Sequence, residues 1–347
     1  MKPVLQQKIN EILRTCYADL LDVTSTKSLG KLQGLSQYNG EAAACVVATR
    51  FGKGLFTNER GNVEELKFRA AADYLHGEHR LHSFNTPNLF KYGAMPSDQL
   101  SVLYKARGLL RQWFRKYDSW DSSIKIPPGE TYIPGYGVVN LHAKLCNTWS
   151  VTEDAYDAFV MLITNTRYLR RMMRVKLHQK YGSELPRVVR ELRVVCRTRF
   201  ALYRALYRPL IEIVDGSRFA SVPKDTKKRR PINIEPLGNI LLQYLIGGEL
   251  RRVNLSVGND LNNGQQHHQQ LCKNLENATI DFSGASDTIS LELIKFLFCN
   301  NGRVLQHLHE DILMARSPMV FMDFGEQTNP FTKHLSLIHI SEPTRLL

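Results

Sequence analysis

The sequence has 347 residues, of which 43% are hydrophobic, and it carries a formal net charge of +13. A chain of this length can bury a sizeable core and form two or three structural units. Its longest apolar runs fall far short of the roughly 20 residues that cross a bilayer, so no membrane-spanning segment is expected. Six cysteines without a C-x-x-C pair argue against a disulfide framework or a zinc site and fit a reducing cytoplasm.

The positive charge is concentrated in one quarter of the chain. Residues 167–252 contain 21 Lys and Arg against 7 Asp and Glu, a net charge of +14, whereas the remaining residues together carry a net charge of -1. A concentrated positive field attracts polyanions and speeds their capture. RNA or a nucleoside triphosphate is therefore the expected partner, and a solvated helix face that keeps the protein soluble is the alternative.

The N-terminal region, residues 1–126, is predicted to be mainly helical. Apolar residues recur with a period near 3.6 over the first 23 residues, and residues 24–62 are rich in Gly, Ser, Thr and Asn, which favours loops around a short helical stretch. A helix is expected from Val63 to about Leu75, and another begins at Pro96 and Ser97.

Residues 127–140 hold three prolines and three glycines, which predicts a turn-rich connection and a domain boundary. Ser150 and Glu153 are spaced as in a capping box, so a helix is expected to start there. Its buried face and the arginine-rich surface at its end each follow helical spacing. A second basic helix follows Pro186. The expected buried residues are Tyr156, Phe159, Val160 and Ile163, and the arginines are Arg167, Arg170, Arg171 and Arg174, then Arg187, Arg190, Arg193 and Arg197.

A proline-bracketed basic segment, VPKDTKKRRPINIEP, occupies residues 222–236. Pro223 and Pro231 each push the preceding residue toward an extended conformation. The basic side chains between them can then converge on phosphates, as catalysis on a triphosphate requires, because the departing pyrophosphate gains negative charge. A basic surface loop or a non-specific RNA patch is the alternative. The five residues are Lys224, Lys227, Lys228, Arg229 and Arg230.

A second segment, ATIDFSGASDTISL, occupies residues 278–291. A short apolar strand is expected to end at Asp281, and Asp287 is expected where a helix begins, with Ile289, Leu293, Ile294 and Leu297 buried behind it. A carboxylate at a strand end is well placed to bind Mg²⁺ for two-metal nucleotidyl transfer. Alternatively, Asp281 is only a turn residue and Asp287 only a helix cap.

The order of these segments resembles the catalytic subunit of the levivirus replicase, the RNA-directed RNA polymerase of small RNA phages. The basic segment is followed by IEPLGN, IGGELRR, DLNNGQQHHQQL and NATIDFSGASDTISL, and WSVTEDAYDAF precedes it. The resemblance covers roughly residues 130–330. It implies an α+β right-hand polymerase fold, with basic fingers including motif F in residues 127–275 and the start of the palm with motif A in residues 276–334.

The resemblance also assigns roles to single residues. Lys224, Lys227 and Arg230 would contact the incoming nucleoside triphosphate, and Glu235 would brace their segment. Asp281 would be the catalytic residue that binds Mg²⁺, and Asp287 would sense the ribose 2′-hydroxyl group. RNA would bind to the arginine-rich helix and to the rest of the basic segment, through Arg167, Arg170, Arg171, Arg174, Lys228 and Arg229.

The family also implies partners: template RNA, nucleoside triphosphates, and the host translation elongation factors Tu and Ts, in the cytoplasm of an infected bacterium and without a membrane. Two readings compete with a template-directed RNA polymerase. A non-catalytic RNA-binding protein would use only the basic segment and leave Asp281 without a role. A reverse transcriptase or DNA polymerase relative would place a bulky residue against the sugar, where Asp287 offers a hydrogen-bond acceptor.

The sequence departs from the family pattern after motif A. The family's Ser-Gly-rich motif B and Gly-Asp-Asp motif C are absent, and no Asp-Asp dipeptide occurs anywhere in the chain. The last residues, LSLIHISEPTRLL in residues 335–347, resemble a translated sequencing adapter and are excluded from functional reasoning. We therefore expect an incomplete polymerase fragment that is inactive by itself.

Overall fold

The chain divides into two compact units in the computed structural model. One unit combines residues 1–76 with 220–232, and the other combines residues 77–219 with 233–347. The functional regions expected from the sequence follow other boundaries and stay a prediction. The structure describes residues 63–84, 89–90, 94–115, 126, 129–133, 136–138, 141–223, 228–261, 263–272, 274, 276–277, 289–322 and 331–333.

The described part of the first unit consists of the start of helix α4 (Val63–Phe84), the end of strand β5 (Gly216–Pro223) and the start of strand β6 (Arg229–Ile234). The helix expected from Val63 is confirmed and runs beyond Leu75. Leu66, Ala70, Ala71 and Tyr74 are buried and lie at the three- and four-residue spacing of one helix face.

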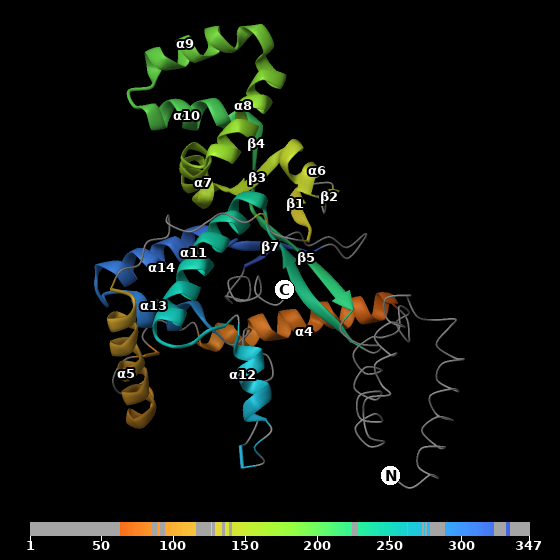
Figure 1. Ribbon diagram of the computed structural model, residues 1–347. Coiled ribbons are helices and arrows are strands. Elements are labelled where there is room, and N and C mark those ends of the chain that lie inside the picture. The colour runs from red at the N-terminus through yellow and green to blue at the C-terminus, as the bar shows by residue number, and fades with distance from the viewer. Residues whose placement is uncertain are drawn as a thin grey trace. The chain divides into compact units, whose positions relative to one another are not determined.

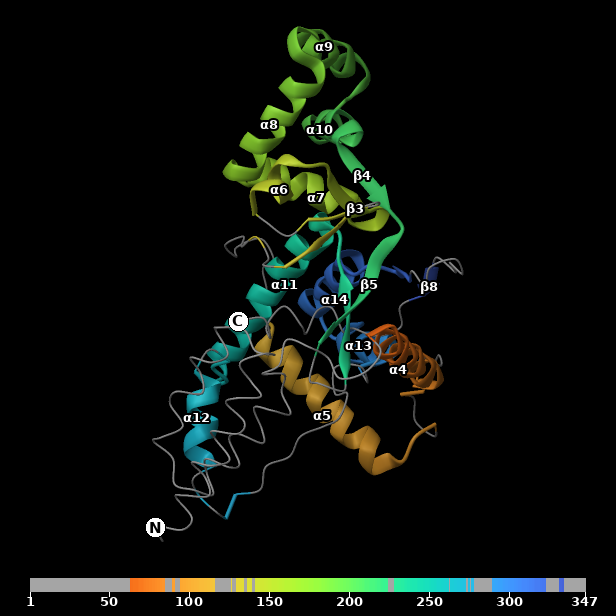
Figure 2. The ribbon, with the colours of Figure 1, turned by 90° about the vertical axis from the view of Figure 1, so that its right-hand side faces the viewer.

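The second unit is mostly helical. Helices α8, α9 and α10 lie together at one end of it in both views (Figures 1 and 2). Its helices are α5 (Ser97–Trp113), α6 (Leu141–Cys146), α7 (Glu153–Asn165), α8 (Arg167–Tyr181), α9 (Leu185–Val195), α10 (Arg199–Tyr207), α11 (Leu237–Ser256), α12 (Gly264–Leu271), α13 (Leu291–Phe298) and α14 (Arg303–Ala315), with 3-10 turns at Gly182–Glu184 and Arg208–Leu210.

The strands form small sheets between these helices. Strands β1 (Thr131–Ile133) and β2 (Tyr136–Val138) make an antiparallel hairpin, and β3 (Trp149–Thr152) runs parallel to β4 (Ile211–Val214). A further sheet has the order β6-β5-β7-β8, in which β7 (Met319–Phe321) pairs parallel with the start of β5 and antiparallel with β8 (Phe331–Lys333). The expected mixture of helices and strands is confirmed at this level.

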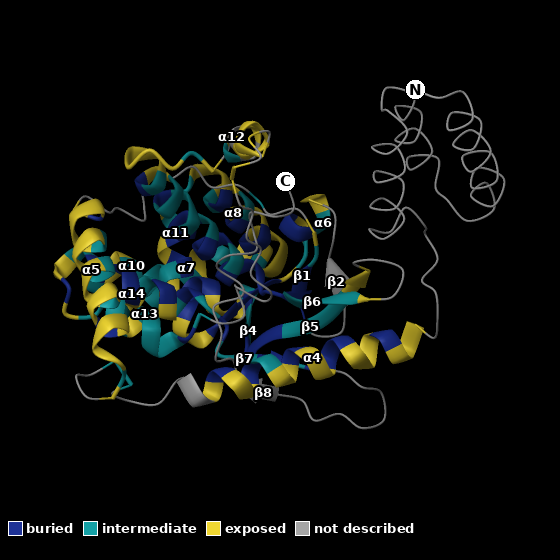
Figure 3. Cartoon of the chain, turned by 90° about the horizontal axis from the view of Figure 1, so that it is seen from below, coloured by how far each residue is buried: buried dark blue, intermediate teal, exposed yellow. Residues whose placement is uncertain are grey.

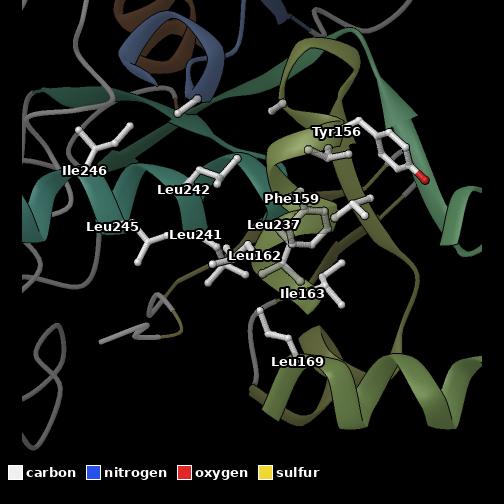
Figure 4. Packing of buried hydrophobic residues seen from close by; sticks show 14 of the residues in the cluster. Tyr156, Phe159, Leu162, Ile163, Leu169, Leu237, Leu241, Leu242, Leu245 and Ile246 are labelled. Carbon is white, nitrogen blue, oxygen red and sulfur yellow. The ribbon is translucent and has the colours of Figure 1, made fainter. Parts of the chain in front are cut away.

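The core of the second unit lies where α7 packs against α11. Tyr156, Phe159 and Ile163 of α7 are buried as expected, and Figure 4 shows them with apolar side chains of α11 and with Leu169 of α8. Helix α11 contributes Leu237, Leu241, Leu242, Leu245 and Ile246. Half of the residues of α11 are buried, whereas α12 is largely exposed (Figure 3).

The expected capping box at Ser150 is wrong. Residues Trp149–Thr152 form β3, and α7 begins at Glu153 with Thr152 as its N-terminal cap. Ser150 is fully buried, and its hydroxyl group donates a hydrogen bond to the carbonyl of Tyr132 instead of accepting one from the helix. The pairing of β3 with β4, about 60 residues later in the chain, outweighs the local capping pattern.

Three other boundaries differ from the sequence predictions. The arginine-rich surface is not the end of α7 but a separate helix, α8, after a break at Thr166. Arg197 lies beyond α9, which ends at Val195. Helix α13 begins at Leu291 with Ser290 as its cap, four residues after Asp287, so Asp287 is not the cap of this helix.

Within the part of the chain that the structure describes, no helix is long and apolar enough to cross a membrane. The described cysteines, Cys146, Cys196, Cys272 and Cys299, form no disulfide. The helix expected in the first 23 residues, the loops expected over residues 24–62 and the tail at 335–347 lie outside the described residues.

Candidate functional site

The structure describes some of the predicted site residues and not others. Arg230, Glu235, Lys228 and Arg229 lie on or beside β6, and the four arginines predicted to bind RNA lie on α8. Asp281, Asp287, Lys224 and Lys227 lie outside the described residues. Arg230 therefore lies on β6, and Glu235 directly follows this strand. The arrangement of these two residues relative to Asp281 and Asp287 stays a prediction.

The described end of the basic segment is extended, as the two prolines predict. Strand β5 ends at Pro223 and β6 starts at Arg229. Pro231, which lacks an N–H group, lies within β6. In the order of the described strands β6 is an edge strand, where a proline is tolerated. Arg229 is half-buried, and its Nε and Nη2 groups donate to the hydroxyl and the carbonyl of Ser221 on β5. These bonds hold the two strands together.

Lys228 and Arg230 differ from Arg229 in their surroundings. Lys228 is exposed and Arg230 is half-buried. Neither side chain forms an ion pair or hydrogen bond with any residue that the structure describes, so both positive charges are available to a phosphate group. Arg229 instead donates two hydrogen bonds to Ser221, through its Nε and Nη2 groups.

Glu235 directly follows β6 and is almost completely buried, with 3% of its surface exposed. Its carboxylate accepts a hydrogen bond from the hydroxyl group of Ser317, just before β7. Burial raises the pKa of the carboxyl group to about 7, although Ser317, the positive charge of Arg316 and hydrogen bonding with Gln243 each lower it. A carboxyl group buried in this way holds the end of β6 against the residues that enter β7.

Backbone contacts fix the same point of the chain. The amide of Tyr132 donates to the carbonyl of Glu235 at 2.8 Å, and Tyr132 forms a parallel bridge with Pro236. Ser150 of β3 donates to the carbonyl of Tyr132, and its hydroxyl group accepts a hydrogen bond from the amide of Leu237 at 3.4 Å. Hydrogen bonds with β1 and β3 thus fix the position of the turn between β6 and α11.

Two amide side chains of α11 continue this polar network toward α14. The side-chain oxygen of Asn239 accepts a hydrogen bond from the backbone amide of Thr152 on β3 at 2.9 Å. Its side-chain NH₂ group donates a hydrogen bond to the Thr152 hydroxyl group at 2.8 Å. Asn239 and Gln243 both donate to the carbonyl of Ala315, at 3.2 and 3.0 Å. This carbonyl belongs to the last residue of α14 and has no N–H donor within its own helix. The network joins α11, β3 and α14 in the core.

Lys176 is a buried cation that the sequence did not single out. Its ammonium group donates to the carbonyls of Cys146, at 2.7 Å, and Asn147 at the end of α6, and it lies 5.2 Å from the ring centre of Trp149. Burial lowers its pKa to about 8. The ammonium group caps the C-terminus of α6, where the helix dipole favours a positive charge. The role of Lys176 is therefore structural.

The predicted RNA-binding arginines are spread over α8. Arg167, Arg171 and Arg174 are exposed and Arg170 is half-buried. Arg170 donates to the carbonyl of Thr164 at 3.1 Å, and the structure gives none of the four an ion pair with the carboxylates that it describes. Their charges are thus open to an external anion.

Sequence reasoning missed the buried polar residues around Glu235. Ser317 lies 82 residues further along the chain, and Asn239 and Gln243, which donate to the carbonyl of Ala315, lie on α11. The signal that could have found Asn239 is the string IEPLGN, in which a polar residue enters an otherwise apolar helix.

Comparison with known proteins agrees with this arrangement. Residues 142–325 match the family model described as RNA replicase, beta-chain, over more than half of the chain. The RNA-directed RNA polymerase subunit beta of Escherichia virus Qbeta is 42% identical over 95 residues, which are 25% of this chain and 16% of that protein. The RNA-directed RNA polymerase beta chain of Enterobacteria phage fr is 41% identical over 85 residues, 24% of this chain and 16% of that protein.

The subunit beta of Qbeta virus strain MX1 is 39% identical over 85 residues, 23% of this chain and 14% of that protein. The matched segments thus span less than a fifth of these relatives. The match to the family model extends from α6 to the end of β7 and includes the basic strand β6, the buried Glu235 and the network of α11. The chain belongs to the RNA replicase beta-chain family.

Proposed function

We propose that this chain is the part of a phage RNA-directed RNA polymerase that holds template RNA and the incoming nucleoside triphosphate. The observation that carries the proposal is the anchored basic strand: Arg230 lies extended on β6, and Glu235 fixes the end of that strand in the core. The printed names of the relatives, RNA-directed RNA polymerase, give the reaction.

The basic segment would neutralise the triphosphate. Lys224, Lys227 and Arg230 contact its phosphate groups in this proposal, while Arg229 holds β6 against β5 through Ser221. Preorganised positive charge acts most strongly where negative charge develops during the reaction, here on the departing pyrophosphate. A segment that is held extended loses little freedom when the triphosphate binds.

Asp281 and Asp287 would divide the remaining work, with Asp281 as the metal-binding catalytic residue and Asp287 as the acceptor of a hydrogen bond from the ribose. A carboxylate is chemically suited to Mg²⁺. In this proposal the metal site uses Asp281 together with further carboxylates of the polymerase. Magnesium ions, when bound, would stabilise the attacking and leaving oxygens.

The wider setting follows from the family. Template RNA and nucleoside triphosphates are the proposed ligands, the fold is a right hand whose fingers and first palm elements lie in this chain, and the cytoplasm of the infected bacterium is the proposed location. Host elongation factors Tu and Ts are proposed partners. No described residue is assigned to them.

A labelling experiment tests the proposal on the chain itself. A photoactivatable nucleoside triphosphate should label residues 222–236, and Lys224→Gln, Lys227→Gln and Arg230→Gln should each weaken the labelling by about 10-fold or more, the scale for one preorganised charge. Arg187→Gln is the control, because this exposed arginine is paired with Glu191 at 2.9 Å. Binding of RNA without specific labelling of this segment would favour a non-catalytic RNA-binding protein.

A further inference from the structure

Helices α8 and α10 carry three arginines that form no ion pair with a carboxylate among the residues that the structure describes. Arg170 and Arg174 lie four residues apart on α8 and therefore share a face of that helix. Arg199 is the first residue of α10. Helices α8 and α10 lie together at one end of the second unit (Figures 1 and 2), so the three arginines belong to the same end of that unit. In agreement with this placement, the positive charges of Arg174, Arg170 and Arg199 each lower the pKa of Tyr207, the last residue of α10.

A stack of side chains along α10 holds Arg199 in place. Arg199, Tyr203 and Tyr207 follow each other at intervals of four residues, so they lie in a row on one face of the helix. The rings of Tyr203 and Tyr207 stack with their centres 5.6 Å apart, and the guanidinium group of Arg199 lies 5.5 Å from the Tyr203 ring centre. Its Nε and Nη2 groups both donate to the Tyr203 hydroxyl group at 3.2 Å.

No internal anion neutralises these arginines among the residues that the structure describes. Tyr207 supplies no negative charge at neutral pH, since an ordinary tyrosine is protonated there and burial raises the pKa of its hydroxyl group further, to about 12. Tyr203 also raises this pKa, whereas the three arginines lower it. Arg170 has one hydrogen bond to the carbonyl of Thr164, and Arg174 has none with a described residue.

Two arginines further along the chain, Arg204 of α10 and Arg208 of the 3-10 turn that follows it, are paired with carboxylates. Arg204 binds Asp157 at 2.6 Å and Arg208 binds Glu153 at 3.2 Å, both on α7. Carboxylates of α7 therefore neutralise Arg204 and Arg208, and no carboxylate that the structure describes does so at Arg199. This contrast distinguishes a binding surface from a general excess of arginine.

We propose that Arg170, Arg174 and Arg199 form a binding site for the phosphate backbone of RNA. The inference rests on the proposed function, which supplies the RNA, and it adds a site that includes Arg199 and is distinct from the triphosphate segment. Arginine forks match phosphate oxygens in geometry and charge.

The site reads the backbone and not the bases. Tyr207 and Arg199 lie on either side of Tyr203 along the helix, so neither face of the Tyr203 ring is free to stack on a base. A polyanion also fits better than a single phosphate group, because α8, α9 and the residues just after α9 carry further exposed arginines. These are Arg167, Arg171, Arg190, Arg193 and Arg197.

The test measures binding of the chain to fluorescently labelled single-stranded RNA oligonucleotides over a range of salt concentrations. Arg174→Gln and Arg199→Gln should each weaken binding by about 3- to 10-fold and reduce the salt dependence by about 0.7 in the log-log slope, the value for one phosphate contact. Arg174 is exposed and unpaired, so its replacement tests the site without disturbing the fold. Binding of oligo(U) and oligo(A) should fall equally.

The matched controls are Arg204→Gln and Arg187→Gln, which remove the same charge from exposed but paired arginines. They should change RNA affinity by less than about 2-fold, since their charges are already neutralised. Equal losses in the controls and in the site variants would overturn the proposal, and so would unchanged binding in Arg174→Gln and Arg199→Gln.

Two further measurements separate the sources of phosphate and the two proposals. Inorganic triphosphate should displace RNA only weakly, and tight binding of triphosphate that is lost in Arg174→Gln would overturn the RNA backbone as the ligand. Labelling of residues 222–236 by the nucleoside triphosphate should persist in Arg174→Gln. If labelling fails in the unsubstituted chain while the arginine effect on RNA remains, the polymerase proposal is wrong and the RNA site stands.

Discussion

The carboxyl group of Glu235 is buried where a charge is costly, and its position explains why it is there. It ends β6, the strand that carries Arg230, and it accepts a hydrogen bond from Ser317 at the entry to β7. Removing a carboxylate from water favours its protonated form, which is why its pKa rises to about 7. Burial of this carboxyl group therefore lowers the stability of the folded protein somewhat, while its hydrogen bond fixes the end of the strand.

The raised pKa of Glu235 predicts that the stability of the protein depends on pH. The folded protein holds the Glu235 proton up to a pKa of about 7, whereas the unfolded chain releases it near the ordinary value of 4.5. The folded state then binds more protons in this window, so the contribution of Glu235 to the free energy of unfolding falls as the pH rises from 4.5 to about 7, by about 3 kcal/mol at most.

Glu235→Gln should remove this fall, because glutamine does not ionise. Urea unfolding at about pH 5 and about pH 8 measures it: stability should decrease less with pH in the variant than in the unsubstituted chain. The exposed Glu310→Gln is the control and should behave like the unsubstituted chain. The same pH dependence in Glu235→Gln and in the unsubstituted chain would show that Glu235 is ionised at both pH values.

Asp281 and Asp287 carry a second prediction, for a complete polymerase that contains this segment. Asp281→Ala should abolish incorporation of every nucleotide, since it removes a carboxylate from the metal site. Asp287→Ala should mainly lower the preference for ribonucleotides over deoxyribonucleotides, by about 10- to 150-fold, the value of one hydrogen bond to a charged group. Incorporation of matched ribo- and deoxyribonucleotides measures both. Near-normal synthesis by Asp281→Ala would refute the metal assignment, and full ribose preference in Asp287→Ala would refute the sugar contact.

Helix α11 is the element that connects the basic strand to the core. It starts directly after Glu235 and Pro236, packs on β3 and α7, and reaches the end of α14 through Asn239 and Gln243. Its close approach to β3 depends on Gly238: a Cβ atom there would lie 2.6 Å from Val151 and 3.0 Å from Phe159. Such distances are too short for carbon atoms, so a side chain would push the helix away from the strand.

Gly238→Ala should therefore destabilise the protein by about 1 to 3 kcal/mol, the usual cost of overpacking a core. Gly247→Ala is the control on the same helix, because no atom lies within 4 Å of the added Cβ. It should instead stabilise the protein by about 0.5 to 1 kcal/mol, since alanine favours a helix over glycine. Thermal unfolding of both variants measures the difference, and a neutral Gly238→Ala would mean that α11 and β3 are not so tightly packed.

Local pattern predicted the helices better than the strands. Apolar spacing identified α7 and its buried residues, and Ser97 correctly marked the start of α5. Strand β3 was missed because its four residues gain their partner from β4, far along the chain. Nothing local in the string WSVT distinguishes such a strand from a helix cap, so Ser150 was assigned to a capping box.

The candidate site was predictable to a similar extent. The two prolines correctly predicted the extended conformation of Arg229 and Arg230, and the resemblance pointed to Glu235. The hydrogen bonds from Ser317 and the network through Asn239 depend on contacts between distant segments. No spacing rule reports those contacts, because they exist only once α11, β3 and α14 have packed.

Across the chain as a whole, charge is separated in a way that suits RNA. Residues 167–252 carry a net charge of +14 and the rest of the chain a net charge of -1. In that stretch the structure pairs only some arginines with carboxylates that it describes, among them Arg187, Arg204 and Arg208. The unpaired remainder can release counterions from an RNA backbone, which gives both affinity and salt dependence.

The location of the charge should therefore matter more than its amount. The double variant Arg167→Glu and Arg171→Glu changes two exposed residues of α8, and the double variant Lys105→Glu and Arg115→Glu changes two exposed residues in or next to α5. Both lower the net charge of the chain by the same amount. Only the α8 variant should lose RNA affinity steeply and reduce the log-log salt slope by about 1.4, the value for two phosphate contacts on a single strand. Equal effects of the two variants on RNA binding, measured by fluorescence anisotropy from about 50 to 200 mM salt, would mean that RNA responds to the overall charge and that α8 is not part of its binding surface.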